Sequence, residues 1–206
     1  MKSFLRLSLP LVAAFVVAHS ALADAKGEAI LKEVELRARK INTYSADMKV
    51  INNGKPESAA LWIQRPDKLF FTFTEGKIIR RIVVNGSVGR VTQGNKAIPI
   101  PPAETPALKA NLWNIVTGNV RALVGEFKEA KYVTQKLIDD VTVLDVIDVI
   151  GSKATVRLYV NGNSFVERVV SNEKAGPTLT DFTFLNLKID EPIPAERFTL
   201  PALSKS

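Results

Sequence analysis

Residues 44–92, YSADMKVINNGKPESAALWIQRPDKLFFTFTEGKIIRRIVVNGSVGRVT, decide the fold, because short apolar runs alternate in them with turn residues. The runs are rich in β-branched and aromatic residues, which is typical of strands. Asn53-Gly54 and Asn85-Gly86 separate consecutive runs, and Asn-Gly is the strongest short-range signal for a hairpin. Turns this close together predict consecutive antiparallel strands, since parallel strands need long crossover connections.

The same alternation of short apolar runs and turn residues returns in the second half of the chain, where Asn161-Gly162 gives another hairpin signal. Between the two halves, residues 97–106 are rich in proline and are expected to be irregular. The expected strands are 44–52, 58–65, 68–75, 78–84, 142–150, 154–161, 164–172 and 178–189, with further strand character from 88 and from 132. A sheet of about nine to eleven strands curls, because large twisted sheets do not stay open and flat.

Two segments have helical patterns. In 27–41, Ile30, Val34, Ala38 and Ile41 recur with the period of a helix, and charged residues fill most other positions. The second segment, 107–126, is expected to break near Gly118. Helices with one apolar face can fill the concave side of a curled sheet. The predicted fold class is therefore mainly β with helices (α+β): an unclosed, strongly curved antiparallel half-barrel with an N-terminal helix and a helical lid insertion.

The first 23 residues have the three parts of a secretory signal peptide. Lys2 and Arg6 are followed by an apolar run, 7–18, and by the small-residue sequence Ala21-Leu22-Ala23. The apolar run is too short to span a membrane. We expect cleavage after Ala23, export to the periplasm, and a single domain over residues 24–206.

Composition limits the chemistry available to this chain of 206 residues. It has no Cys, and its one His, His19, lies in the predicted signal segment. The mature protein would therefore lack thiolate metal sites, Cys nucleophiles and a Ser-His-Asp triad, and we expect no metal, no cofactor and no enzymatic activity. A periplasmic hydrolase using Ser–Lys or paired carboxylates remains a distant alternative. The net charge of +7 is spread along the chain, so we expect no nucleic-acid site.

Two stretches carry a more specific pattern: 60–71, ALWIQRPDKLFF, and 180–201, TDFTFLNLKIDEPIPAERFTLP. With the signal segment and the opening helix that runs into residues 43–47, they resemble the periplasmic outer-membrane lipoprotein carrier family, LolA. The resemblance implies an unclosed β-barrel covered by helices. It also implies a monomeric carrier that takes acylated lipoproteins from an inner-membrane ABC-type lipoprotein-releasing complex and passes them to an outer-membrane acceptor.

The resemblance assigns roles to particular positions. Arg65 corresponds to the arginine that contacts the lid helices. The expected acyl-chain cavity is lined by residues of a strand and of the lid: Leu69, Phe71, Phe73, Leu108, Leu112, Ile115 and Val116. Without the resemblance, the same aromatic residues are ordinary core residues, and Arg65 is a surface cation. One departure is that residues 88–92 lack the aromatic residues usual in the family, which keeps a carrier or sensor of another lipid as the alternative function.

Overall fold

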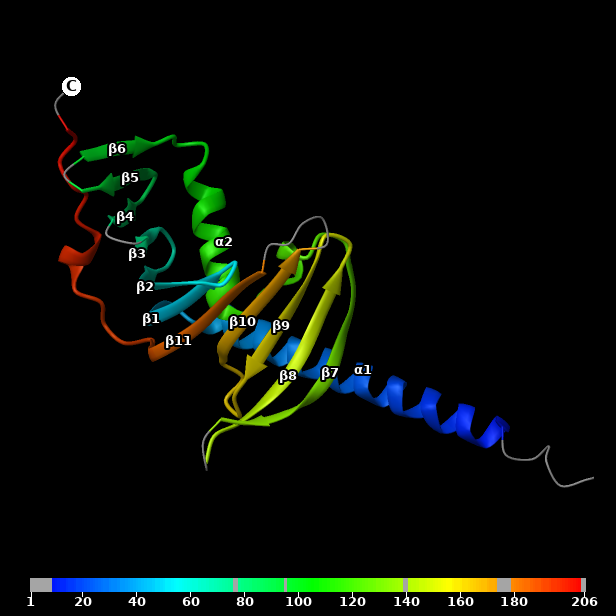
Figure 1. Cartoon of the computed structure of the whole chain (residues 1–206). Coiled ribbons are helices and arrows are strands. Elements are labelled where there is room, and N and C mark those ends of the chain that lie inside the picture. Colours follow the sequence, from blue (N-terminus) through cyan, green and yellow to red (C-terminus); the bar gives the residue numbers. More distant parts are fainter. Residues whose placement is uncertain (1–8, 76–77, 95, 139–140, 174–178, 205–206) are drawn as a thin grey trace, which may run out of the picture.

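A computed structural model describes residues 9–75, 78–94, 96–138, 141–173 and 179–204, with side chains from Asp24 onward except at positions 75 and 179 (Figure 1). The elements, in chain order, are α1 (Leu9–Lys40), β1 (Thr43–Asn52), β2 (Lys55–Gln64), β3 (Lys68–Glu75), β4 (Ile78–Asn85), β5 (Val88–Gln93), β6 (Lys96–Ile100), α2 (Thr105–Thr117), the 3-10 helix η1 (Arg121–Leu123), β7 (Phe127–Leu137), β8 (Val143–Gly151), β9 (Ala154–Val160), β10 (Val166–Glu173), β11 (Leu179–Ile189) and the 3-10 helix η2 (Ala195–Phe198).

The strands form one antiparallel sheet in the order β6-β5-β4-β3-β2-β1-β11-β10-β9-β8-β7. Two meanders meet where the last strand, β11, pairs with the first, β1. The sheet is not closed: within the described residues, β6 and β7 are its two edges. The expected unclosed half-barrel with an N-terminal helix and a helical insertion is therefore confirmed.

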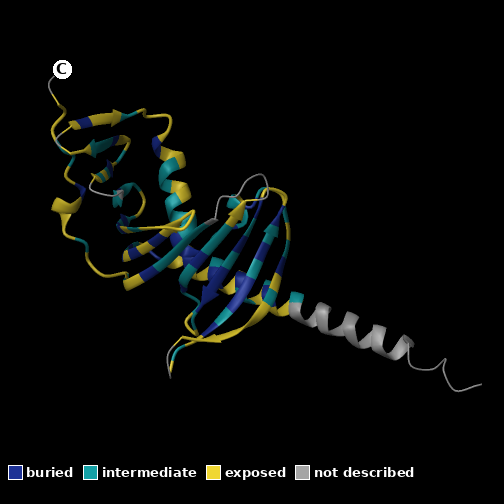
Figure 2. Ribbon diagram, viewed as in Figure 1, coloured by how far each residue is buried: buried dark blue, intermediate teal, exposed yellow. Residues whose placement is uncertain are grey.

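Both faces of the sheet are covered at β3. In β3, Leu69 belongs to the main hydrophobic core on the concave side, with Phe71 packed against it. Their neighbour Phe70 points to the convex side and packs with Val83 and with Phe198 of η2. Alternation of side chains along a strand sends successive residues to opposite faces. The C-terminal segment therefore covers the convex face with a second, smaller core (Figure 2).

The junction between β1 and β11 contains an irregularity. The pairing register shifts between Ser45 and Asp47, and Asn186 on the partner strand has a positive φ of 51°. The side-chain amide of Asn186 donates a hydrogen bond to Asp47 Oδ2 at 2.9 Å. Asn tolerates this left-handed conformation better than most residues. A bulge of this kind bends the sheet at its centre.

Helix α1 lies against β7 at close range. A Cβ on Gly27 would collide with the backbone of Ala130 and Tyr132, so only glycine fits at this crossing. Glu28 Oε1 accepts a hydrogen bond from the Ala130 N–H at 3.0 Å, which satisfies a backbone donor of the edge strand. The helix thereby anchors the edge of the half-barrel.

The element bounds differ from the sequence expectations at several places. Helix α1 begins at Leu9 rather than at residue 27, because the Leu- and Ala-rich stretch before Gly27 also favours a helix. Residues 96–100 form β6 in spite of Pro99, which an edge strand tolerates. Strand β2 begins at Lys55 rather than at residue 58. Of the predicted signal segment, residues 1–8 lie outside the described part, and 9–23 are described only as helical backbone.

Candidate functional site

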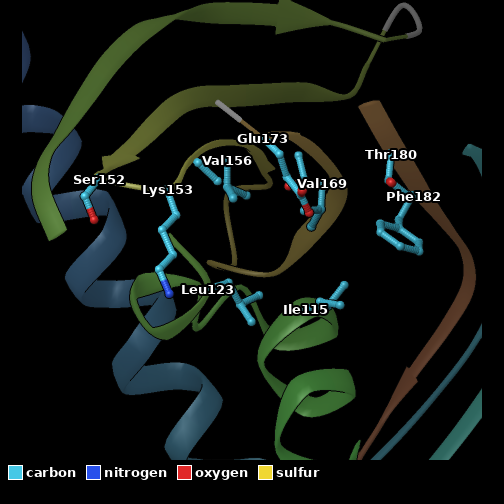
Figure 3. A pocket seen from close by; sticks show the side chains of 11 residues that line it. Ile115, Leu123, Ser152, Lys153, Val156, Val169, Glu173, Thr180 and Phe182 are labelled. Atoms are coloured by element: carbon cyan, nitrogen blue, oxygen red, sulfur yellow. The ribbon is translucent and has the colours of Figure 1, made fainter. Parts of the chain in front are cut away.

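A cavity of about 690 Å³ opens on the concave side of the sheet. It lies between the C-terminal end of α2, the 3-10 helix η1 and the strands β9, β10 and β11 (Figure 3). Its volume is in the range of pockets that hold small molecules. The lining residues are Ile115, Leu123, Ser152, Lys153, Ala154, Val156, Val169, Ser171, Glu173, Thr180 and Phe182.

The lining separates into an apolar interior and a polar mouth. Ile115 and Leu123 come from the helical side, and Val156, Val169 and Phe182 from the sheet (Figure 3). The polar and charged lining residues lie toward strand ends and a hairpin turn: Ser152, Lys153, Ser171, Glu173 and Thr180. An apolar chamber with polar groups at one end suits an amphiphile, whose hydrocarbon part leaves water while its head stays near solvent.

The 3-10 helix η1 is held over the cavity by two kinds of contact. Arg121 donates hydrogen bonds to Glu35 Oε1 at 2.7 Å and to Glu28 Oε2 at 2.9 Å, which ties η1 to α1. These bonds and the nearby carboxylates outweigh desolvation and raise the pKa of Arg121. The guanidinium also lies 3.8 Å from the ring centroid of Phe127. Arg121 therefore stays charged and fixes the position of the neighbouring cavity residue Leu123.

The second contact joins η1 to the β8–β9 turn. The Lys153 N–H donates to the Val124 carbonyl at 3.0 Å. Gly125, with a φ of +80°, follows directly, and a Cβ there would approach the Ser152 Oγ to 2.7 Å. Glycine is needed here both for its backbone conformation and for the close approach of the turn. The segment at η1 that covers the cavity is thus held in place by the β8–β9 hairpin.

Arg65 lies where the two helices approach the end of β2. Its guanidinium donates hydrogen bonds to the carbonyl oxygens of Arg39, at 3.1 Å, and Ile41, at 3.4 Å. Both carbonyl groups lie at the C-terminal end of α1, where a cation also interacts favourably with the helix dipole. The same guanidinium lies 5.3 Å from the ring centroid of Trp113 on α2. Arg65 therefore touches both helices that cover the concave face.

The residues assigned to an acyl-chain cavity from the sequence are placed mainly outside the observed cavity. Ile115 lines it. Val116 and Leu69 are fully buried in the main core. The remaining four, Phe71, Phe73, Leu108 and Leu112, are partly buried and pack against that core. The structure thus gathers all seven in one hydrophobic cluster, and six of them fill the space between sheet and α2 rather than border an open volume.

Sequence reasoning missed the residues of β9 and β10 that border the cavity. Val156 and Val169 look like ordinary alternating strand residues, and Lys153 and Glu173 like ordinary solvent-exposed charges. The available signal was the strand alternation itself, which places Val156 and Val169 on the face toward the helices. Which stretch of that face stays unfilled depends on how far α2 reaches across it, and no local pattern encodes that distance.

Tyr44 stands at the centre of the concave face, on β1 next to β11. Its ring packs edge-on against Phe184, with centroids 6.4 Å apart. Among the described residues, its buried hydroxyl has no hydrogen-bond partner. Burial raises the pKa of the phenol well above its ordinary value, so the group is neutral at any physiological pH.

Two further features bear on other classes of site. No group of three or more His, Cys, Asp or Glu residues in the described part of the chain is arranged to hold a metal ion. No described helix has both the length and the apolar character required to cross a membrane.

No protein-family model and no curated protein matches the chain. Solved structures do. LppX from Mycobacterium tuberculosis, described as a lipoprotein, has a TM-score of 0.54 and 16% identity over 81% of this chain and 98% of its own. LprF from Mycobacterium bovis has a TM-score of 0.55 and 13% identity, over 82% and 95% of the two chains. An uncharacterized conserved protein from Thermus thermophilus has a TM-score of 0.56 and 11% identity, over 85% and 94%.

The chain shares its fold with LppX and LprF. The resemblance noted in residues 60–71 and 180–201 is therefore confirmed at the level of the fold, which is what likenesses at such low identity establish. A structure of MucB aligns over 86% of this chain with 13% identity and a TM-score of 0.48, but the chain spans only 64% of the length of MucB.

Proposed function

We propose that this LolA-like chain is a non-covalent carrier that shields the acyl chains of lipoproteins and moves them through the periplasm from the inner to the outer membrane. Its partners would be an inner-membrane ABC-type releasing complex and an outer-membrane acceptor. The observation that carries the proposal is the apolar cavity of about 690 Å³ under α2 and η1. The fold shared with the lipoprotein LppX supports a place in the cell envelope.

The energetics explain why such a carrier is needed. Each methylene exposed to water costs about 0.8 kcal/mol, so a 16-carbon chain costs about 12 kcal/mol. A cavity lined by Val156, Val169, Phe182 and Leu123 recovers a large part of that free energy. No bond has to be made or broken, so the role requires no catalytic residue.

Release requires that the covering helices can move. In this proposal, Arg65 holds α1 and α2 together at the end of β2 through its contacts with Arg39, Ile41 and Trp113. Its hydrogen bonds are few and partly exposed, so they can break at a modest cost. Loss of Arg65 would loosen the cover and impair the ordered release of cargo.

A second candidate function is the transport or sensing of a free lipid. The polar mouth favours it, because Lys153 and Glu173 place charges where a lipid head would lie. An acylated protein presents a polypeptide at that position instead. The two candidates share the acyl-chain cavity and differ in the head.

Native mass spectrometry of the protein purified from its own cell envelope tests the proposal. We expect an acylated protein bound one-to-one, whereas a free lipid would identify the second candidate. A protein that holds neither, and that extracts no lipoprotein from membranes, would contradict both.

The Arg65→Leu variant tests the release step, with Arg197→Leu on the convex face as the matched control. We expect Arg65→Leu to retain bound cargo and to pass it more slowly to acceptor membranes, while Arg197→Leu behaves like the parent. Equal transfer by both variants would remove Arg65 from the mechanism.

A further inference from the structure

The mouth of the cavity carries one positive and one negative side chain that do not pair with each other. Lys153 lies in the β8–β9 turn, and Glu173 ends the described part of β10. Both are exposed and both line the cavity. Among the described residues, neither side chain takes part in an ion pair.

We infer that this mouth is a headgroup site for a zwitterionic phospholipid, with the phosphate bound by Lys153 and the amine bound by Glu173. This inference rests on the proposed function, since it requires acyl chains to occupy the apolar interior. It names the lipid class for the free-lipid candidate.

Lys153 is held so that its ammonium group can reach a ligand. Its backbone N–H is bound to the Val124 carbonyl, which fixes the base of the side chain. Figure 3 shows the side chain extending from the turn into the space between sheet and helices, toward Leu123. An ammonium in such a half-enclosed position binds a phosphate by charge-assisted hydrogen bonds, which are stronger there than in open solvent.

Glu173 occupies a neighbouring position on the next strand. It pairs in register with Ala154, the residue that follows Lys153, so the two residues lie at the same end of the strands that line the cavity. A headgroup with an anion and a cation separated by a short linker can contact both. A purely anionic head would leave the Glu173 carboxylate beside a like charge, which opposes binding.

Hydroxyl groups complete the mouth on the β11 side. Ser171 and Thr180 are directly paired across β10 and β11, and both line the cavity. Their hydroxyls can donate hydrogen bonds to phosphate or ester oxygens. The sequence from apolar interior through hydroxyls to charges follows the order of acyl chain, ester and head in a phospholipid.

The experiment compares three lipids that share one palmitoyl chain. Lysophosphatidylethanolamine carries phosphate and amine, lysophosphatidic acid carries phosphate alone, and monopalmitoylglycerol carries neither. Calorimetric titration below the micelle concentration gives the three dissociation constants for the parent and for Lys153→Gln and Glu173→Gln. Lys128→Gln, an exposed lysine on β7 outside the cavity, is the matched control.

We expect the parent to bind lysophosphatidylethanolamine about tenfold more tightly than monopalmitoylglycerol. Lys153→Gln should lose most of the affinity gained from phosphate. Glu173→Gln should lower the affinity only for lysophosphatidylethanolamine, the lipid that carries the amine. Neither should change the binding of monopalmitoylglycerol, and Lys128→Gln should change nothing.

Equal affinity of the parent for the three lipids would overturn the headgroup site and leave the acyl-chain carrier standing. The same holds if the two cavity variants behave like Lys128→Gln. Failure of all three lipids to bind would instead overturn the acyl-chain cavity, and with it the free-lipid candidate.

Discussion

The concave face has two halves, β2 to β4 and β9 to β11, which carry the same kinds of apolar residue but are not packed equally. On β2 to β4, the inward side chains such as Leu61, Leu69 and Val84 are buried completely, and Phe71 and Phe73 pack beside them. On β9 to β11, Val156 and Val169 are also buried and belong to the same core, but with the half-buried Phe182 they border an open volume of about 690 Å³. The β2–β4 half is filled, and the β9–β11 half combines core with cavity.

The difference arises from where the helices lie, not from strand composition. Helix α2 runs from the β6 side across the concave face and ends at Gly118, whose φ of +72° terminates it. Its residues Leu108 and Leu112 pack into the core that Leu69 shares. Beyond Gly118 the chain continues only as the short η1, which contributes Leu123 and leaves space above the strands. Because α2 is short, it fills only one part of a continuous apolar face and leaves a cavity over the other part.

The largest expected effect compares two identical substitutions, one in each half. Leu69→Ala should lower the free energy of unfolding by about 2–5 kcal/mol, because it opens a void in a closely packed core. Leu123→Ala should lower it by clearly less, since Leu123 already borders open space and loses fewer contacts. Urea unfolding of both variants gives the two values. Equal losses would mean that the cavity half is as tightly packed as the other.

The next largest effect is expected when a small side chain in each half of the concave face is replaced by phenylalanine. Ala59→Phe on β2 should destabilise the protein by about 1–3 kcal/mol, because Ala59 is buried opposite Phe73 and the core has no room. Ala154→Phe adds the same volume next to the cavity and should be tolerated while it blocks the binding of monopalmitoylglycerol. Thermal unfolding and lipid titration separate the outcomes. If Ala154→Phe binds lipid as the parent does, the cavity assignment is wrong.

The smallest effect concerns Tyr44, between the two halves. Tyr44→Phe removes a buried hydroxyl that lacks a partner among the described residues, so it should leave stability unchanged or raise it by about 1 kcal/mol near neutral pH.

The same substitution carries a pH signature. Because burial raises the pKa of Tyr44, the folded state favours the neutral phenol, and this contribution is fully present below the ordinary pKa of 10.0. It is lost as the pH rises further, and Tyr44→Phe does not share that loss. The stability difference between variant and parent should therefore widen from pH 9 to 11 in urea titrations. A constant difference would show that the hydroxyl is solvated in the folded protein.

Most strands and the fold class follow from local sequence. Asn53-Gly54, Asn85-Gly86 and Asn161-Gly162 mark hairpins at the places where the structure has them, because only a few residues accept the backbone conformation of a tight turn. The expected strand 68–75 is observed as β3 with the same bounds. Residues 96–100 were not predicted as a strand, because the low strand propensity of Pro99 is overridden by the edge pairing of β6 with β5.

The candidate site followed from sequence only in outline. Arg65 was assigned a lid contact by resemblance, and the structure places its guanidinium against α1 and against Trp113 of α2, a geometry that the Arg65→Leu variant has yet to test in function. Ile115 was the one assigned cavity residue that borders the open volume. The pair Lys153 and Glu173 had no sequence signal, since exposed charges near turns and strand ends are ordinary.

By itself, the sequence determined an antiparallel sheet large enough to curl, two helices with apolar faces, and a chemistry without Cys and with a single His outside the expected mature domain. These features depend on neighbours within a few residues, so periodicity and turn residues reveal them. Only the tertiary structure decided that β1 and β11 join the two meanders, that α2 fills one half of the concave face, and that Lys153 and Glu173 both line the cavity in the other. The physical reason is that packing across the sheet depends on distances between segments more than 100 residues apart, such as Tyr44 and Phe184, which no local pattern records.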